Sequence, residues 1–331
     1  MCLTRVFFLR VLTLLCMLAA PVAQAVPSCG RHDAAAPALR RLSQAMAQAR
    51  FVAYQPTQIR VVAGRASRAD DAGIRADLQA LRPRFDALVT YSAGNGADRV
   101  ADIAAELGFR AVIQGVWAID DEGEIALALA AAARHPDLVV GLSLGNERVF
   151  ARVTDFVALA ARIAVLRKRA PRLALATTEP FHLFAQDAAQ PLLATADFLL
   201  INAHPVFQPW FAGASDADAA RFVVNVTAEI AARFCGPLFV KETGVPTAPA
   251  SMGYTVARQA GFYRALRAQF APTGQRAFAY FSAFDAPWRV NDAHPTSGPQ
   301  PQEGSWGLFD EARHPKQAAR EVPLLPVRPH P

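Results

Sequence analysis

The sequence lacks an apolar stretch long enough to span a membrane near its start. Residues 11–20 are apolar, but this run of roughly ten residues is about half of what a bilayer-spanning helix needs. Arg5 and Arg10 precede the run, and the small-residue sequence Ala23-Gln24-Ala25 follows it. This order is typical of a secretory signal peptide, so we expect residues 1–25 to be removed from an exported protein, periplasmic or extracellular, with no stable membrane anchor.

Cysteine is scarce, with four residues in the whole chain. Cys2 and Cys16 lie within the expected signal peptide, and Leu15 is not the small residue that lipidation requires before a cysteine. The mature chain therefore keeps Cys29 and Cys235. In an oxidising compartment these two can pair, but two free thiols are equally compatible with the sequence.

The sequence also lacks a basic face with interleaved aromatic residues. The formal net charge is +6, and it becomes +4 once Arg5 and Arg10 are removed. Nearly all the cations are arginines, scattered along predicted helices. The run Arg167-Lys168-Arg169 stands where a helix should end, so a helix-dipole interaction explains it as well as an anion site would. We therefore expect no nucleic-acid partner.

After residue 50 the chain repeats a β-branched or aromatic run followed by an Ala/Leu/Arg-rich helical stretch. Eight such units in one domain predict a single (β/α)8 TIM barrel of the α/β class over residues 51–320. Residues 26–50 form an N-terminal extension, residues 59–73 an excursion after the first strand, and residues 321–331 a proline-rich tail, extended or disordered. The rival open sheet usually carries a glycine-rich phosphate turn after its first strand, and that turn is missing. The predicted strands are 51–54, 87–91, 111–116, 138–144, 173–177, 198–202, 238–241 and 277–282; the clearest predicted helices are 97–107, 122–133, 154–169, 219–233 and 255–270.

Two glutamates follow predicted strands four and seven. The C-terminal strand ends of such a barrel converge on one face, so Glu147 and Glu242 can point into one cleft although they are far apart in the sequence. Breaking a glycosidic bond needs one carboxylic acid and a second carboxylate, held roughly 5 Å apart in a retaining enzyme. We expect Glu147 to be the acid/base, with a raised pKa, and Glu242 the ionised nucleophile. Asn146 is placed to hydrogen-bond the sugar 2-hydroxyl.

Other strand ends supply candidate binding residues. Glu179 is expected to bind substrate or support a residue that does, with a structural ion pair as the alternative. His204 is expected to be a hydrogen-bonding residue of the active site, because no HExxH pattern or second ligand at suitable spacing makes it a metal site. Asp285 and Lys241 could bind substrate or form salt bridges at the rim. We expect no metal and no cofactor.

All four tryptophans follow predicted strands three, six and eight, on the side expected to hold the active site. A groove edged by Tyr91, Trp117, Trp210 and Trp288 would offer flat apolar faces to sugar rings. The fourth tryptophan, Trp306, lies on the same side but is not assigned to this groove.

Two motifs carry a resemblance to a known family. The segments Leu144-Gly145-Asn146-Glu147 and Lys241-Glu242-Thr243-Gly244-Val245-Pro246-Thr247 resemble the acid/base and nucleophile motifs of glycoside hydrolase family 17, the β-1,3-glucanases and glucanosyltransferases. Segments 90–92, 281–288, 306–309 and 315–316 resemble its bacterial branch, and the likeness covers about residues 51–316. The resemblance implies retaining chemistry on a β-1,3-linked glucan oligosaccharide or polysaccharide. We expect a monomer.

The sequence departs from that family at three positions. Val245 stands where Trp is common, Ala286 where the bacterial branch often has Glu, and His204 where Tyr is common. Linkage preference, hydrolysis or transfer, and endo or exo action therefore stay open.

Two other functions remain as alternatives. One is a β-glucan-binding barrel without turnover, against which the presence of both glutamates argues. The other is a serine esterase, because the segment Gly141-Leu142-Ser143-Leu144-Gly145 fits the nucleophile-elbow pattern. Asp197 or Asp285 followed by His294 would complete a triad in the right order. However, Ser143 would lie inside a strand and not on a tight turn.

Overall fold

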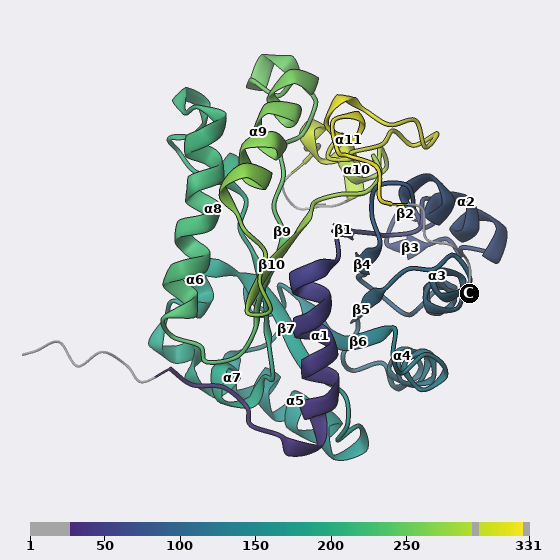
Figure 1. Ribbon diagram of the computed structural model, residues 1–331, viewed down its shortest axis with the longest axis vertical. Helices are drawn as coiled ribbons and strands as arrows, with labels where there is room; N and C mark the ends of the chain where they lie inside the picture. The colour runs from purple at the N-terminus through teal and green to yellow at the C-terminus, as the bar shows by residue number, and fades with distance from the viewer. Residues whose placement is uncertain (1–26, 293–297, 327–331) are drawn as a thin grey trace, which may run out of the picture.

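The protein folds around a closed barrel of parallel strands, as the computed structural model shows (Figure 1). It describes residues 27–292 and 298–326, so the expected signal peptide lies outside the described residues. The predicted (β/α)8 barrel is confirmed. In order around the barrel, the strands are β1 (Phe51–Ala53), β10 (Arg276–Tyr280), β9 (Leu238–Glu242), β8 (Leu199–Asn202), β7 (Leu175–Pro180), β6 (Val139–Asn146), β5 (Ala111–Val116) and β4 (Ala87–Val89).

Most strands of the barrel are buried along their whole length because both of their faces are covered. Every residue of β5 is buried, as is every residue of β7, β8 and β9. This continuous burial is what a parallel sheet between a packed interior and an outer layer of helices requires.

Helices follow the strands and pack around the barrel (Figure 1). Side-chain caps fix where five of them begin: Asp70, Asp121, Asp155, Ser215 and Thr255 each accept a backbone N–H of the first turn. The helices are α2 (Asp71–Leu81), α3 (Val100–Glu106), α4 (Glu122–Arg134), α5 (Phe156–Arg169), α6 (Phe181–Phe184), α7 (Gln190–Thr195), α8 (Asp216–Ala231), α9 (Val256–Gln269), α10 (Arg289–Asp292) and α11 (Gln317–Arg320). Short 3-10 turns are η1 (Asp33–Ala35), η2 (Ala97–Arg99), η3 (Asp187–Ala189), η4 (Pro205–Phe207), η5 (Phe211–Gly213), η6 (Ala250–Met252) and η7 (Pro301–Gly304).

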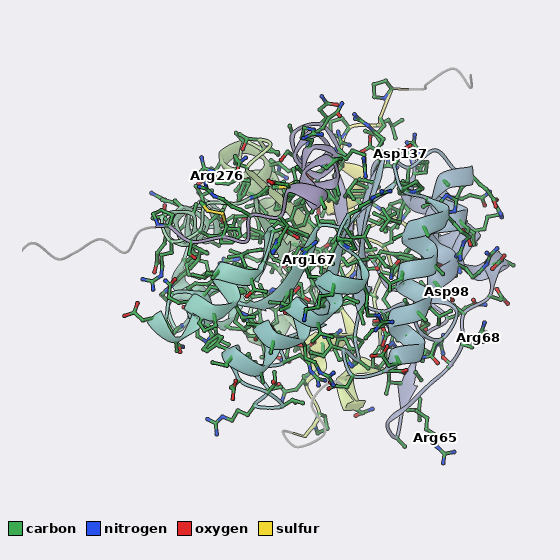
Figure 2. The ribbon with its side chains drawn as sticks, turned by 90° about the horizontal axis from the view of Figure 1, so that it is seen from below. Arg65, Arg68, Asp98, Asp137, Arg167 and Arg276 are labelled. Carbon is green, nitrogen blue, oxygen red and sulfur yellow. A yellow bond between two sulfur atoms is a disulfide. The ribbon has the colours of Figure 1, made fainter. Side chains whose placement is uncertain are left out.

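The excursion after the first strand contains a small hairpin. Strands β2 (Val61–Val62) and β3 (Arg65–Ala66) pair antiparallel, and Arg65 projects away from the barrel (Figure 2). No helix in the described parts of the chain is long and apolar enough to cross a membrane.

The N-terminal extension closes the barrel floor. Helix α1 (Ala36–Gln48) contacts both β6 and β10, which lie on opposite sides of the ring, and it buries Leu42 and Met46 there. Cys29 forms a disulfide with Cys235, with their Cα atoms 5.4 Å apart. Because Cys235 directly precedes β9, the disulfide ties the start of the chain to the floor. It is drawn in yellow in Figure 2.

The C-terminal segment lies against the barrel as far as it is described. The Arg50 guanidinium donates to the carbonyl of Pro323 at 2.6 Å, and the amide of Leu325 donates to the carbonyl of Pro83 at 2.8 Å. Residues 321–326 therefore lie along the barrel, which is the extended alternative of the two predicted for the tail. The remainder of the tail lies outside the described residues.

Candidate active site

The loop after β6 carries Glu147 in an uncommon backbone conformation. Glu147 has a φ of +54°, a left-handed value that few non-glycine residues adopt, and its amide donates to the carbonyl of Thr178 at 2.8 Å. The fully buried carboxyl group of Glu179 on β7 accepts the amides of Val149 at 2.8 Å and Phe150 at 3.1 Å. These bonds to β7 hold the turn in a conformation that it would not keep alone.

The surroundings of Glu147 favour the protonated form of its carboxyl group. Burial, and then the nearby charge of Glu242, raise the pKa of Glu147 above its ordinary value. These effects outweigh the hydrogen bond from Asn202, at the end of β8, whose amide nitrogen donates to Oε1 of Glu147 at 2.8 Å and lowers that pKa. A carboxyl group with a raised pKa is suited to donate a proton to a leaving oxygen.

Glu242, the last residue of β9, has the opposite electrostatic environment. Burial works against its ionisation, yet a hydrogen bond from His204 and the charge of Lys241 hold its pKa below the ordinary value. The His204 Nε2 to Glu242 Oε2 distance is 3.4 Å, long for a hydrogen bond. Oε1 of Glu242 is buried with no hydrogen-bond partner among the described residues. An ionised carboxylate with one uncommitted oxygen is suited to attack a carbon centre.

A bond between Lys241 and Asn146 joins the two strand ends that carry the glutamates. The Lys241 ammonium donates to Oδ1 of Asn146 at 2.7 Å and lies 4.3 Å from the centroid of the Tyr91 ring. Burial lowers the pKa of Lys241 to about 8, although Glu242 and Glu147 counteract this. Because an ammonium only donates, it must take the amide oxygen, and the NH2 group of Asn146 is left for another acceptor. The ends of β6 and β9 thus meet over one site.

Aromatic rings form the wall beside Glu242. The His204 ring packs edge-on against Trp306 at 5.0 Å, and Trp306 packs against Phe281 at 5.2 Å. Burial, then the charge of Glu242, raises the pKa of Tyr91 well above its ordinary value. The Tyr91 hydroxyl is therefore neutral and can only act as a hydrogen-bonding group.

A small open cavity adjoins this wall at the mouth of the barrel. Tyr91, Phe281, Trp288 and Trp306 line it together with polar residues from the loops after β1 and β10. Arg289 pairs with Glu303 at 2.9 Å and lies over the Phe281 ring. The cavity therefore combines flat apolar faces with hydrogen-bonding groups, which is the composition of a sugar site.

The match to a protein family covers most of the barrel. A family model described as the BtgE/BtgC glycoside hydrolase domain matches residues 52–307. The chain belongs to this glycoside hydrolase family.

Relatives agree with this assignment. A glucan 1,3-beta-glucosidase from Arthroderma benhamiae is 24% identical over 267 residues, which cover 75% of this chain and 84% of the relative. The glycoside hydrolase family 17 beta-1,3-glucanosyltransferase from Rhizomucor miehei has the same fold, with a TM-score of 0.61 and 21% identity over 81% of this chain and 95% of its own. An active-site mutant of a Rhizomucor miehei beta-1,3-glucanosyltransferase in complex with laminaritriose has a TM-score of 0.61 and 20% identity, covering 81% and 96%. The resemblance to family 17 is confirmed.

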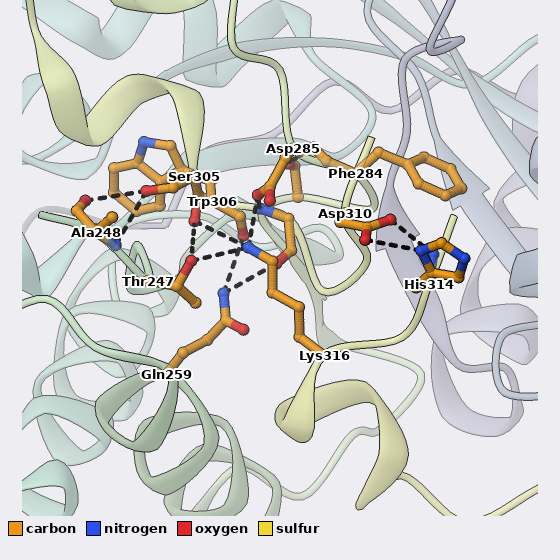
Figure 3. A network of polar contacts seen from close by, with 12 residues as sticks. Thr247, Ala248, Gln259, Phe284, Asp285, Ser305, Trp306, Asp310, His314 and Lys316 are labelled. Carbon is orange, nitrogen blue, oxygen red and sulfur yellow. Dashed lines mark hydrogen bonds and ion pairs between the residues drawn. The ribbon is translucent and has the colours of Figure 1, made fainter. Parts of the chain in front are cut away.

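Two of the predicted binding residues of this glycoside hydrolase make contacts that support the rim, and one of them, Asp285, also lines the cavity. Glu179 is fully buried and holds the loop of Glu147 through two backbone amides, which is the supporting role among its expected ones; it forms no ion pair in the described part of the chain. Asp285 forms the rim salt bridge that was its alternative: Oδ1 lies 2.7 Å from Lys316 Nζ and accepts the amide of Gly307 at 2.8 Å (Figure 3). Lys316 also donates to Thr247 at 2.9 Å, so the network joins three loops of the rim.

The tryptophans are divided between the cavity and the outer surface. Trp306 is buried in the wall, whereas Trp288 is partly exposed at the cavity. Trp117 and Trp210 are 52% and 41% exposed on the loops after β5 and β8. Tyr91, Trp288 and Trp306 line the same cavity, whereas Trp117 and Trp210 are not among its lining residues.

The serine-esterase alternative fails on geometry. Ser143 lies inside β6, is 1% exposed, and its hydroxyl bonds that of Thr178 at 2.9 Å. Asp197 precedes β8 at the floor, where it pairs with Arg167 and His32. His294 lies outside the described residues. In the parts of the chain that are described, no group of three or more His, Cys, Asp or Glu side chains is arranged to hold a metal ion.

Sequence reasoning names Lys241 as a candidate residue but misses its contact with Asn146, and it misses Asn202 as a neighbour of Glu147. Asn202 and Lys241 both stand at strand ends, which is a visible signal, but the sequence does not say which side chain each one meets. The pairings of Asn202 with Glu147 and of Lys241 with Asn146 follow from barrel closure alone.

Proposed function

We propose that this glycoside hydrolase acts on β-1,3-linked glucan with retention of configuration, through a covalent glucosyl-enzyme. The observation that supports the roles is the opposite perturbation of the two carboxyl groups: the pKa of Glu147 is raised and that of Glu242 is lowered. The names of the relatives, a glucan 1,3-beta-glucosidase and a glucanosyltransferase crystallised with laminaritriose, support β-1,3-glucan as the substrate.

In the proposed first step, Glu242 attacks the anomeric carbon and forms an ester bond to it. The bond to the leaving oxygen breaks, and that oxygen takes the proton of Glu147. In the second step the ionised Glu147 accepts a proton from water or a sugar hydroxyl, whose oxygen displaces Glu242 from the anomeric carbon. The NH2 group of Asn146, oriented by Lys241, donates to the 2-hydroxyl of the sugar at this centre.

Incubation with laminari-oligosaccharides, followed by chromatography, tests the activity. Shorter products mean hydrolysis and longer products mean transfer. Binding with no product would establish the non-catalytic glucan-binding alternative instead.

Variants of the two glutamates test their roles. Glu242→Ala should lose turnover and regain it with azide, giving a glycosyl azide of inverted configuration, because azide fills the space of the missing nucleophile. Glu147→Ala should still cleave aryl glycosides, whose leaving groups need little protonation. Glu229→Gln, an exposed carboxylate on α8, is the matched control and should remain active. Turnover by Glu242→Ala without azide, or a rescued product of retained configuration, would contradict the assignment.

We also propose that the protein is exported and acts as a monomer. The signal-peptide pattern of residues 1–25 supports export, and so does the Cys29–Cys235 disulfide, since such bonds persist in oxidising compartments. Cell fractionation with mass measurement of the mature chain should find a protein that starts at Val26, and light scattering should give the mass of one chain. An intact N-terminus in the cytosolic fraction would contradict export.

A further inference from the structure

A row of aromatic rings extends from the loop of Glu147 across the C-terminal face. Successive ring centroids are 6.0 Å apart from Phe150 to His182, 5.6 Å from His182 to Phe181, 5.4 Å from Phe181 to Phe222, and 5.4 Å from Phe222 to Trp210. We call these five residues the aromatic row. Phe150 and Trp210, at its two ends, are 53% and 41% exposed, and His182 is also exposed.

Packing between helices accounts for only the middle of the row. Phe181 on α6 and Phe222 on α8 are half-buried against each other, as expected where two helices touch. Phe150 and Trp210 bury much less of their surface. A single exposed ring is common on a protein surface, but exposed rings joined by a continuous line of aromatic contacts beside an active site are the composition of a ligand-binding surface.

The row and the cavity lie on opposite sides of the catalytic pair. The row comes from the loops after β6, β7 and β8, whereas the cavity is lined by the loops after β1, β4 and β10. Around the barrel, β7 and β8 occupy the arc between β6 and β9, and β10, β1, β4 and β5 occupy the other arc. Since Glu147 directly follows β6 and Glu242 ends β9, a chain bound across the centre would run from the cavity to the row.

The chemistry of Glu147 decides which end of a glucan each side would hold. A general acid must contact the leaving oxygen, so the leaving sugar lies on its side, and an incoming acceptor takes the same place in the second step. Phe150 is three residues from Glu147, on the loop that Glu179 anchors. The row is therefore on the side of the leaving group and acceptor, and the cavity on the side of the donor sugar.

We propose that the aromatic row binds the acceptor end of a β-1,3-glucan chain, and that the enzyme consequently transfers glucan to sugar acceptors in competition with hydrolysis. This inference rests on the proposed function. Neighbouring rings of the row pack edge-on, at interplanar angles between 63° and 86°, so the exposed rings of Phe150 and Trp210 at its ends are the ones that can stack on the C–H faces of glucose units. An acceptor hydroxyl so held attacks the anomeric carbon of the glucosyl-enzyme, the bond to Glu242 breaks with its electron pair returning to the carboxylate, and the hydroxyl proton passes to Glu147.

The experiment measures which fraction of the glucosyl-enzyme reacts with water and which fraction reacts with a sugar acceptor. An aryl β-laminaribioside serves as donor and laminaritriose as acceptor. Aryl release by the wild-type protein reports formation of the glucosyl-enzyme, and chromatography of the same mixture gives the ratio of transfer product to hydrolysis product. Because both products arise from one intermediate, a change in overall rate cancels from this ratio.

Trp210→Ala should lower the ratio at fixed acceptor concentration by roughly tenfold, the equivalent of about 1.4 kcal/mol of lost stacking. Phe150→Ala should lower it in the same direction, and Trp210→Phe, which keeps a flat ring, should retain most of the transfer. Val165→Ala, which shortens an exposed side chain on the outer helix α5, is the control and should match the wild type.

Each outcome bears on a different claim. Absence of aryl release by the wild-type protein would overturn the proposed function. Aryl release with no transfer product at any acceptor concentration would overturn the acceptor role, as would an unchanged ratio in folded Trp210→Ala and Phe150→Ala. Circular dichroism of each variant establishes that it is folded.

Discussion

Replacing Lys241 by Met removes a cation that links the end of β9 to the end of β6. Lys241 is 1% exposed, and Met fills a similar volume with a flexible, uncharged chain. Two consequences follow from the contacts of the ammonium. Oδ1 of Asn146 loses its donor, so the amide is free to turn, and Glu242 loses a charge that holds its pKa down.

The size of the effect follows from the bond that is lost. A hydrogen bond to a charged group contributes about 1.5–3 kcal/mol. If Asn146 uses its orientation mainly in the transition state, the variant should lose roughly ten- to hundredfold in kcat/KM. A role exerted through Asn146 also predicts that the double variant Lys241→Met/Asn146→Ala loses no more than the worse single variant.

The pH profile gives a readout that a purely structural role would not move. Lys241 lowers the pKa of both Glu242 and Glu147. Removing its charge raises both pKa values, so Glu242 ionises and Glu147 loses its proton at higher pH. The acid and alkaline limbs of kcat/KM against pH on laminari-oligosaccharides should therefore both shift upward. Lys168→Met, at an exposed lysine on α5, is the control and should leave the profile in place.

Two results would refute this reasoning. An unshifted profile in folded Lys241→Met would show that the ammonium does not set the charge states of the glutamates. Additive losses in the double variant would show that Lys241 does not act through Asn146.

Two further variants separate supporting residues from substrate contacts. Burial raises the pKa of Glu179 to about 7, so its protonation stabilises the fold; that stabilisation is complete below pH 4.5 and is lost as the pH rises through about 7. The side chain of Glu179→Gln cannot ionise. Urea unfolding at pH 5 and at pH 8 should therefore show that, over this pH rise, the variant gains up to about 3 kcal/mol in free energy of unfolding relative to the wild type. The same pH dependence in both proteins would contradict the raised pKa. Asp285→Ala leaves the largely buried Lys316 without its carboxylate partner. The variant should lose about 3 kcal/mol in free energy of unfolding with little change in KM. A stable variant with a strongly raised KM would instead show that Asp285 contacts the substrate.

The barrel could be predicted because its strands differ in composition from the helices between them. Each predicted run overlaps an observed strand, and the departures are at ends. Strand β7 continues through Glu179 to Pro180, beyond the predicted residue 177, where the buried carboxyl group of Glu179 holds the loop after β6. From the sequence, an acidic residue followed by proline predicts a loop. The contact of the Glu179 carboxyl group with the loop after β6 explains why these residues extend the strand instead.

The site could be predicted only as far as position along the strands determines it. Strand ends place Glu147, Glu242, Asn146 and His204 on one face, and they meet there. Whether a single side chain is exposed or buried depends on which residues of the other loops pack against it. Trp306 shares the composition and position of an exposed stacking residue, yet the return of its segment against the His204 ring buries it.

The different protonation states of Glu147 and Glu242 likewise depend on their neighbouring residues. Both are strand-end residues of one chemical type, and Glu242 is if anything the more buried, which alone would keep it protonated. Its ionisation depends on His204 and Lys241, whereas at Glu147 burial and the repulsion of Glu242 outweigh the Asn202 amide and the weaker effects of His204 and Lys241. The charge that makes Glu242 a nucleophile is thus also what keeps the proton on Glu147, so any change that neutralises one carboxyl group should alter the other.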